Sequence, residues 1–230
     1  MRSIYDFVIE PLGDRYSNTK KISDSELILN TNISNFKSVN KLARVVSTPL
    51  AYTTDIEKGD IVVVHHNIFR RFHNIRGEEV NSRSYFKENL YFCAVDQLYL
   101  YNKNNEWITF LDRCFIAPIK SNNKFTTEKT SIQKGIIVYG NPKLKEYNLE
   151  IGDLISFKKD REFEFTINDQ LLYCMKLNDI VVKYEHERNE EIYNPSWARS
   201  SEGIDKSGEG GDCRYRGGCI CGPTKERSCH

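Results

Sequence analysis

Two sets of short apolar segments follow one another in the same order along the chain. Three matches in one order rarely arise by chance, and such repeats usually reflect a repeated structural unit. The chain is therefore predicted to contain two copies of one unit. The matching segments are 8–12 with 115–119, 57–62 with 150–155, and 96–100 with 178–182, and the offset between the copies falls from each match to the next.

The falling offsets show where the two copies differ in length. The second copy is shorter than the first before its Gly-Asp pair, and it is shorter again after that pair. Compact domains lose length from loops rather than from core strands. The first copy is therefore predicted to carry two loop extensions, near residues 18–40 and 65–86, and functional surfaces concentrate in such extensions.

Short apolar or β-branched runs, bounded by turn residues, recur from residue 1 to residue 184 and are typical of β-strands. No run keeps a helical period of 3.6 residues for more than two turns. Gly59-Asp60 and Gly152-Asp153 precede equivalent strands, where glycine permits a positive φ and aspartate can bond nearby backbone. Strands are predicted at 7–12, 43–47, 60–64, 90–95, 97–101, 114–119, 135–139, 153–157, 162–167, 171–175 and 179–183.

The charge balance bears on the class of partner. The 230 residues include 33 Lys or Arg and 32 Asp or Glu, a net charge of +1, which argues against nucleic acid as a partner. The longest apolar runs, such as Ile61–Val64, are far shorter than the roughly 20 residues that span a bilayer. We therefore expect neither a membrane segment nor a secretory start.

The composition changes near the C-terminus. Seven of the 13 glycines fall in residues 195–230, where Ile204 and Ile220 are the only large aliphatic residues. Such a segment buries too little apolar surface to offset its ordering entropy. We therefore expect three parts: residues 1–103, residues 104–184, and a charged linker with a mostly irregular Cys/Gly-rich tail over 185–230.

The first copy resembles the GroES co-chaperonin family. Residues 9–15, Ile-Glu-Pro-Leu-Gly-Asp-Arg, are similar to the family's opening Pro-Leu-x-Asp-Arg signature, although the second copy lacks the Asp-Arg pair. Residues 43–47, 58–63, 89–92 and 96–98 resemble later strands of the family in the same order. The Lys/Asn/Ile-rich composition and the tail look more like tailed-phage GroES-like proteins than a host copy.

The resemblance implies an all-β fold of two tandem GroES-like small β-barrels. It also implies a long loop whose aliphatic triplet docks into an apolar groove of the host chaperonin, in the bacterial cytoplasm. Leu27, Ile28 and Leu29 form such a triplet in the first extension, and residues 121–133 contain none. The alternative is an ordinary strand packed on its own barrel, because short apolar runs are ambiguous.

The resemblance further implies a homo-oligomeric ring. The family forms seven-membered rings, and two-barrel chains cannot close an odd ring with both barrels at equivalent positions. Either the first barrel alone forms the ring, or the symmetry differs. A third alternative is that the fold serves as a structural or decoration protein of the virion, where it would contact other virion proteins.

The second extension is predicted to be a hairpin that contacts a partner. Arg70, Arg71, Phe72 and Arg76 combine cationic and aromatic groups, which can grip carboxylates. His65, His66 and His73 could supply metal ligands, but adjacent histidines on a strand point to opposite faces. A solvated hairpin or a subunit contact is the favoured interpretation.

The seven cysteines fall into two groups. Cys93, Cys114 and Cys174 lie in apolar runs and are interpreted as small buried hydrophobes. The tail cysteines Cys213, Cys219, Cys221 and Cys229 could hold tetrahedral zinc, but they lack paired Cys-x2-Cys knuckles. No cofactor is expected; zinc and disulfides between chains remain alternatives for the tail.

Catalytic motifs are not recognised in the sequence. There is no phosphate-binding glycine loop between a strand and a helix, and no metal-ligand helix motif. The protein is therefore expected to be a binding module rather than an enzyme.

Overall fold

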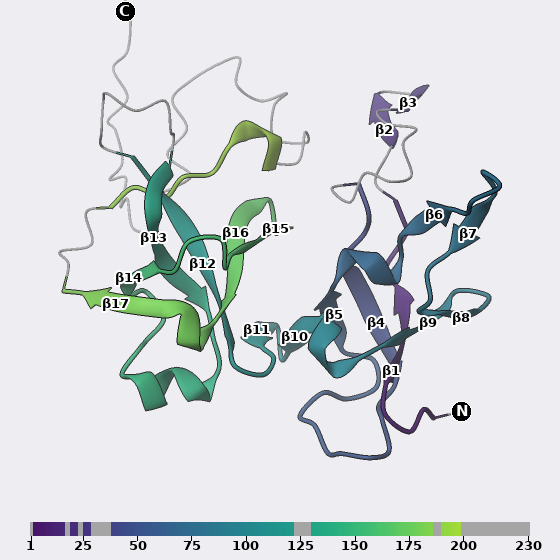
Figure 1. Cartoon of the computed structure of the whole chain (residues 1–230), viewed down its shortest axis with the longest axis horizontal. Coiled ribbons are helices and arrows are strands. Elements are labelled where there is room, and N and C mark those ends of the chain that lie inside the picture. Colours follow the sequence, from purple (N-terminus) through teal and green to yellow (C-terminus); the bar gives the residue numbers. More distant parts are fainter. Residues whose placement is uncertain are drawn as a thin grey trace, which may run out of the picture.

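The computed structural model describes residues 2–16, 19–22, 25–28, 38–121, 130–185 and 190–198. The fold is mostly β, with two large antiparallel sheets and only short 3-10 helices among these residues. No closed barrel is detected in the same ranges. The two sheets lie side by side, with β10 and β11 between them (Figure 1). Within the described ranges, no helix is long and apolar enough to cross a membrane.

The first sheet has seven strands in the order β11-β10-β5-β4-β1-β9-β8. Most of its strands alternate buried and less buried positions, or are buried along most of their length, as in Ile61–Val64. A continuous apolar run is typical of a strand that lies inside a sheet and is buried on both of its faces. The strands are β1 (Phe7–Pro11), β4 (Leu42–Ser47), β5 (Ile61–Val64), β8 (Tyr85–Lys87), β9 (Leu90–Cys93), β10 (Leu98–Lys103) and β11 (Glu106–Thr109).

The second sheet has six strands in the order β15-β16-β12-β13-β14-β17. Its longest strand, β13, pairs with β12 on one side and with β14 on the other. The strands are β12 (Arg113–Lys120), β13 (Thr130–Tyr139), β14 (Leu154–Phe157), β15 (Phe163–Ile167), β16 (Gln170–Lys176) and β17 (Ile180–Tyr184). All the strands predicted from the sequence are therefore present.

The two sheets repeat one topology. Without β11, the order β10-β5-β4-β1-β9-β8 corresponds strand by strand to β17-β14-β13-β12-β16-β15. The register repeats as well: Pro11 pairs with Ala43, and Pro118 pairs with Gly135. The first strand of each copy also shows a register irregularity at an equivalent position. The predicted internal repeat is confirmed at the level of strand pairing.

The Gly-Asp turns are equivalent in detail. Gly59 and Gly152 have φ values of +100° and +95°, which favour glycine because side chains rarely adopt them. The side-chain carboxylate of Asp60 accepts a hydrogen bond from the Glu57 backbone N–H at 2.8 Å. The equivalent bond to Asp153, from the Glu150 backbone N–H, is 2.7 Å long. Each turn thus closes on its own aspartate before the chain enters a strand.

The extra length of the first copy forms two hairpins. The first lies between β1 and β4 and contains β2 (Thr19–Ile22) and β3 (Ser25–Ile28). The second lies between β5 and β9 and contains β6 (Arg71–His73) and β7 (Glu79–Asn81). Each hairpin forms a two-stranded sheet of its own. Both therefore occur at the places where the offsets between the copies change.

Three apolar clusters form the core. One lies within the first sheet and one within the second. The third joins the two sheets and includes Tyr99 and Leu100 from the first, with Phe165 and Cys174 from the second. The rings of Tyr99 and Phe165 have centroids 5.0 Å apart. The two repeats are thus packed against each other rather than simply linked.

Residues 190–198 differ from the solvated linker expected there. Ile192 forms a β-bridge with Ile119, and the Tyr193 N–H donates to the Pro118 carbonyl at 2.8 Å. The Asn194 side chain accepts from the Leu171 N–H at 3.1 Å. Backbone bonding to the second sheet holds this stretch in spite of its charge. Residues 186–189 and 199–230 of the predicted linker and tail lie outside the described residues.

Candidate partner-binding face

The predicted aliphatic triplet falls on the β2–β3 hairpin. Leu27 pairs with Lys20, and Ile28 pairs with Thr19, across the two strands. Leu29 lies outside the described residues, and only the backbone of β2 and β3 is described. The hairpin belongs to neither large sheet and stands off one end of the first sheet (Figure 1). Leu27 and Ile28 therefore lie on a hairpin that is not part of the seven-stranded sheet.

Backbone and side-chain bonds close the foot of this hairpin. Tyr16 and Val39 form an isolated β-bridge, and both are buried. The Asn40 side chain donates to the carbonyls of Leu12 and Asp14, both at 2.9 Å. Its amide oxygen accepts from the N–H of the first residue of β4 at 2.8 Å. One asparagine therefore ties together the strands that enter and leave the extension.

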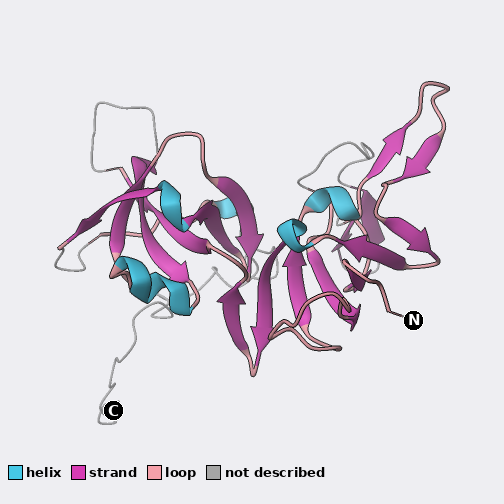
Figure 2. Ribbon diagram, turned by 60° about the horizontal axis from the view of Figure 1, so that its bottom comes forward, coloured by secondary structure: helices cyan, strands magenta, loops and turns pink. Residues whose placement is uncertain are grey.

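The second extension folds as a hairpin, as predicted, and its contact with a partner stays a prediction. Arg71 and Phe72 lie in β6, which pairs with β7, while Arg70 precedes β6 and Arg76 lies in the connecting turn. The hairpin projects from the first sheet (Figure 2). Ile75 at its turn is fully exposed, and Phe72 is also exposed. This hairpin therefore presents apolar and cationic groups together.

The cations of this hairpin differ in their surroundings. The Arg71 guanidinium forms an ion pair with Glu79. The Arg70 guanidinium lies 4.9 Å from the centroid of the Phe72 ring, in a cation–π contact. Within the described part of the chain, the Arg76 guanidinium has no ion-pair partner. Arg76 is thus the cation of this hairpin that is most available to a partner's carboxylate.

Arg15 connects the feet of the two hairpins. Its Nε and Nη2 donate to the Phe69 carbonyl at 3.2 and 2.8 Å, and its Nη1 donates to Asn81 Oδ1 at 2.8 Å. The guanidinium also lies 5.3 Å from the centroid of the Tyr91 ring. The sequence showed Arg15 only as part of a signature, because a contact between positions so far apart in the chain leaves no local pattern. The structure brings the two extensions together at one end of the sheet.

The histidines do not adopt the expected arrangement. His65 and His66 lie at the start of the 3-10 helix η1 (His66–Ile68), not on a strand, so their rings do not point to opposite faces. The rings stack with centroids 4.2 Å apart. Burial, together with the neighbouring His65, lowers the pKa of His66 to about 4. His73 lies apart, in β6, and the described residues contain no cluster of metal-ligating groups.

The body cysteines are buried free thiols, as predicted. Cys93, Cys114 and Cys174 are each almost fully inaccessible. Burial raises the pKa of all three, to about 12 for Cys114, so they are neutral at pH 7. The tail cysteines Cys213, Cys219, Cys221 and Cys229 lie outside the described residues, and the zinc alternative stays a prediction.

No protein-family model matches the chain, and no curated protein matches its sequence. The repeated sheets and the two hairpins at one end of the first sheet are therefore the features that point to a function.

Proposed function

We propose that the chain is a co-chaperonin of the tailed-phage GroES-like type, which caps a bacterial host chaperonin and encloses its folding chamber. The observation that carries the proposal is the asymmetry between two topologically equivalent sheets. The first copy alone has an aliphatic triplet in its extension, and Leu27 and Ile28 of this triplet lie on a hairpin outside both large sheets. In this proposal each sheet belongs to a GroES-like small barrel, and the chain performs no chemistry.

The proposed docking contacts are Leu27, Ile28 and Leu29. Burying one such side chain in an apolar groove is worth roughly 1.5–3 kcal/mol before ordering costs. A two-stranded hairpin is only marginally stable by itself, so ordering it on a partner offsets much of that gain. Several hairpins held in one symmetric assembly would bind tightly, because each contact raises the effective concentration of the next.

The junction between the two sheets supports self-assembly. Tyr99 and Leu100 of β10 are buried against the second sheet. Their equivalents on β17 are Val181 and Val182, whose exposures are 60% and 41%. Strand β17 of the second sheet therefore exposes an apolar surface. The equivalent surface of the first sheet, on β10, is covered by the second sheet.

The complementary surface lies on the first sheet. Cys174 and Phe165 of the second sheet pack against β10, and Phe92 occupies the ladder position equivalent to Cys174. Phe92 packs against the exposed ring of Phe86, with centroids 5.0 Å apart. A second copy can therefore repeat the intrachain junction head to tail, and a contact of this kind can close into a ring. Such a ring contains an even number of sheets.

Chaperonin capture tests the docking role. Purified chain is mixed with a GroEL-type chaperonin and nucleotide, and the complex is measured by native mass spectrometry. We expect the parent chain to bind and Ile28→Asp to lose binding while keeping its circular dichroism spectrum. Ile75→Asp, at the other hairpin, is the matched control and should still bind. Equal binding of the parent and Ile28→Asp refutes the role of the triplet.

The same measurement tests the assembly contact. Val182→Arg places a charge on the exposed strand β17 and should reduce the oligomer to single chains, since an unpaired charge is costly in an apolar interface. Lys176→Arg keeps the charge of its site and serves as the control. An unchanged oligomer in Val182→Arg contradicts the proposed junction.

The projecting β6–β7 hairpin favours one second candidate function. Its exposed Phe72 and Ile75, with Arg76, would suit a contact between subunits of a particle. A virion structural or decoration protein would be found in stoichiometric amounts in purified particles and would not respond to chaperonin. A mass-spectrometric inventory of purified particles distinguishes this role from that of a free co-chaperonin in the host cytoplasm.

A further inference from the structure

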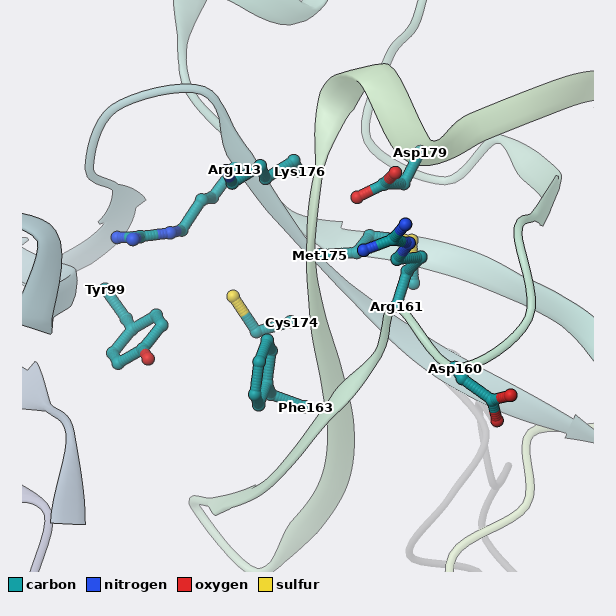
Figure 3. A pocket seen from close by; sticks show the side chains of 9 residues that line it. All are labelled: Tyr99, Arg113, Asp160, Arg161, Phe163, Cys174, Met175, Lys176 and Asp179. Atoms are coloured by element: carbon teal, nitrogen blue, oxygen red, sulfur yellow. The ribbon is translucent and has the colours of Figure 1, made fainter. Parts of the chain in front are cut away.

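A pocket of about 500 Å³ lies at the junction of the two sheets. Tyr99 of β10 borders it on one side, and residues of β15, β16 and the turn before β15 border it on the other (Figure 3). This volume is within the range of sites that hold small organic ligands. The pocket is remote in sequence from both hairpins of the partner-binding face, so it requires a separate interpretation.

One part of the pocket is apolar and buried. Tyr99, Cys174 and Met175 are almost fully buried, and burial raises the pKa of the Cys174 thiol, which therefore carries no charge. Phe163, at the edge of the pocket, is 58% exposed. An exposed ring beside a buried apolar wall offers a ligand an aromatic surface at little cost in ordering.

The cations of the pocket are available to a ligand. Among the described residues, neither Arg161 nor Lys176 has an ion-pair partner for its charged group. Arg113 is held in position, because its Nη1 and Nη2 donate to the carbonyls of Leu98 and Asp96, both at 2.7 Å. These three groups place positive charge around the apolar wall.

The two carboxylates of the pocket offset this charge incompletely. Asp179 lies 3.9 Å from the ammonium of Lys158, which is outside the lining, so part of its charge is compensated there. Asp160 lies at the far side of the pocket from Tyr99 (Figure 3). The lining therefore favours an anion near Arg161 and Lys176.

The two sheets differ at the positions that line the pocket, although their strand pairing is the same. The ladder position of Cys174 is occupied in the first sheet by Phe92, whose ring packs on Phe86. The position of Lys176 is occupied there by Ala94. The framework therefore accommodates a large ring and no cation at these positions, whereas the second sheet has a small thiol and an ammonium.

We propose that this junction pocket binds a small organic anion with an aromatic body. The ring packs against Phe163 and the apolar wall, and the anionic group binds Arg161 and Lys176. The inference is independent of the co-chaperonin role, because it uses neither hairpin and needs no chaperonin.

Two fluorescent probes test the proposal on the full chain. 8-Anilinonaphthalene-1-sulfonate has an aromatic body and an anionic group, and N-phenyl-1-naphthylamine has a similar body without the charge. We expect one sulfonate probe per chain. Its affinity should fall about tenfold in the double variant Arg161→Gln/Lys176→Gln, because hydrogen bonds to charged groups are among the strongest. The neutral probe should bind both proteins within about twofold, which also reports that the double variant keeps its fold.

Further variants complete the test. Phe163→Ala should weaken both probes, because it removes the aromatic surface that they share. The charge-matched control Arg83→Gln/Lys145→Gln removes two exposed cations outside the pocket and should leave both affinities unchanged. Equal affinity of the sulfonate probe for the parent and the pocket double variant overturns the proposal. An equal loss in the control variant overturns it as well.

Discussion

The hydroxyl of Tyr16 accepts a hydrogen bond of 2.7 Å from the backbone N–H of Arg71. The bond joins the foot of the β2–β3 hairpin to the first residue of β6. Tyr16→Phe leaves this N–H without its acceptor in a part-buried site. We expect the free energy of unfolding to fall by about 1–2 kcal/mol, measured by urea denaturation.

A matched change elsewhere isolates this effect. Tyr101 is as buried as Tyr16, and its hydroxyl has no hydrogen-bond partner among the described residues. Tyr101→Phe should therefore change the stability by less than about 0.5 kcal/mol. Equal losses in the two variants would mean that the Tyr16 bond contributes nothing specific.

Arg113 holds the two sheets together by bonding the backbone just before and within β10. Its guanidinium donates to two carbonyls and lies 4.5 Å from the centroid of the Tyr99 ring. Arg113→Lys keeps the charge but cannot reproduce the two-pronged geometry. We expect a loss of about 1–3 kcal/mol in denaturant unfolding. Arg44→Lys is the control, because its exposed pair with Glu10 is worth little.

Gly135 occupies a place where a side chain does not fit. A Cβ there would lie 2.5 Å from Ile116 Cδ1 and 2.8 Å from the Ala117 carbonyl oxygen. Since the backbone oxygen cannot easily move, we expect Gly135→Ala to cost about 1–3 kcal/mol. The equivalent residue of the first sheet is Ala43, whose buried methyl group fits, so Ala43→Gly should cost about 1–2 kcal/mol through lost burial and added backbone freedom rather than through a clash. Calorimetric melting of both variants gives the comparison, and a neutral Gly135→Ala would contradict it.

The stability of the protein should depend on pH through His66. Its pKa is about 4 in the folded chain, against 6.5 when exposed, because burial and the adjacent His65 disfavour its charged form. Between pH 6.5 and 4 the unfolded chain therefore binds more protons, and stability falls as the pH falls through this window. Above this window the folded state keeps the contribution in full.

His66→Gln measures the size of this effect. The side chain is half-buried, so solvent reduces the effect, and we expect the fall in Tm between pH 7 and pH 5 to shrink by about 2–4 °C in the variant. Asn67→Gln, which changes an exposed and uncharged side chain of the same 3-10 helix, should leave the pH dependence as it is. An identical pH profile for the parent and His66→Gln would assign the effect to other groups.

The strands and the repeat could be predicted because their signals are local. Apolar runs predicted β1 and β12, and the two Gly-Asp pairs marked equivalent turns whose positive φ the structure contains. The places of the two extensions followed from changes in offset alone. Topology then follows, since each copy pairs the same strands in the same register.

The features that could not be predicted from the sequence mostly depend on contacts between residues that are distant in the chain. β11 (Glu106–Thr109) was not predicted, although three of its four residues favour β-strands, because the run is short and is separated from β10 only by a tight turn. The β-bridge between Ile192 and Ile119 of β12 could not be predicted, because Ile192 follows a charged run that is typical of a solvated linker. His65 and His66 were misplaced because the β5 run ends in a 3-10 turn at that point. The contacts of Arg15 likewise depend on the folded geometry.

The extension that carries Leu27 and Ile28 belongs to one half of a fused pair. Any assembly of whole chains therefore has one β2–β3 hairpin for every two large sheets, whatever the number of chains. In the proposed ring the hairpins would lie at alternate sheet positions, so a partner with evenly spaced grooves would be contacted at double the spacing of the sheets. Because both sheets belong to one chain, the proposed docking would use one hairpin for every two sheets.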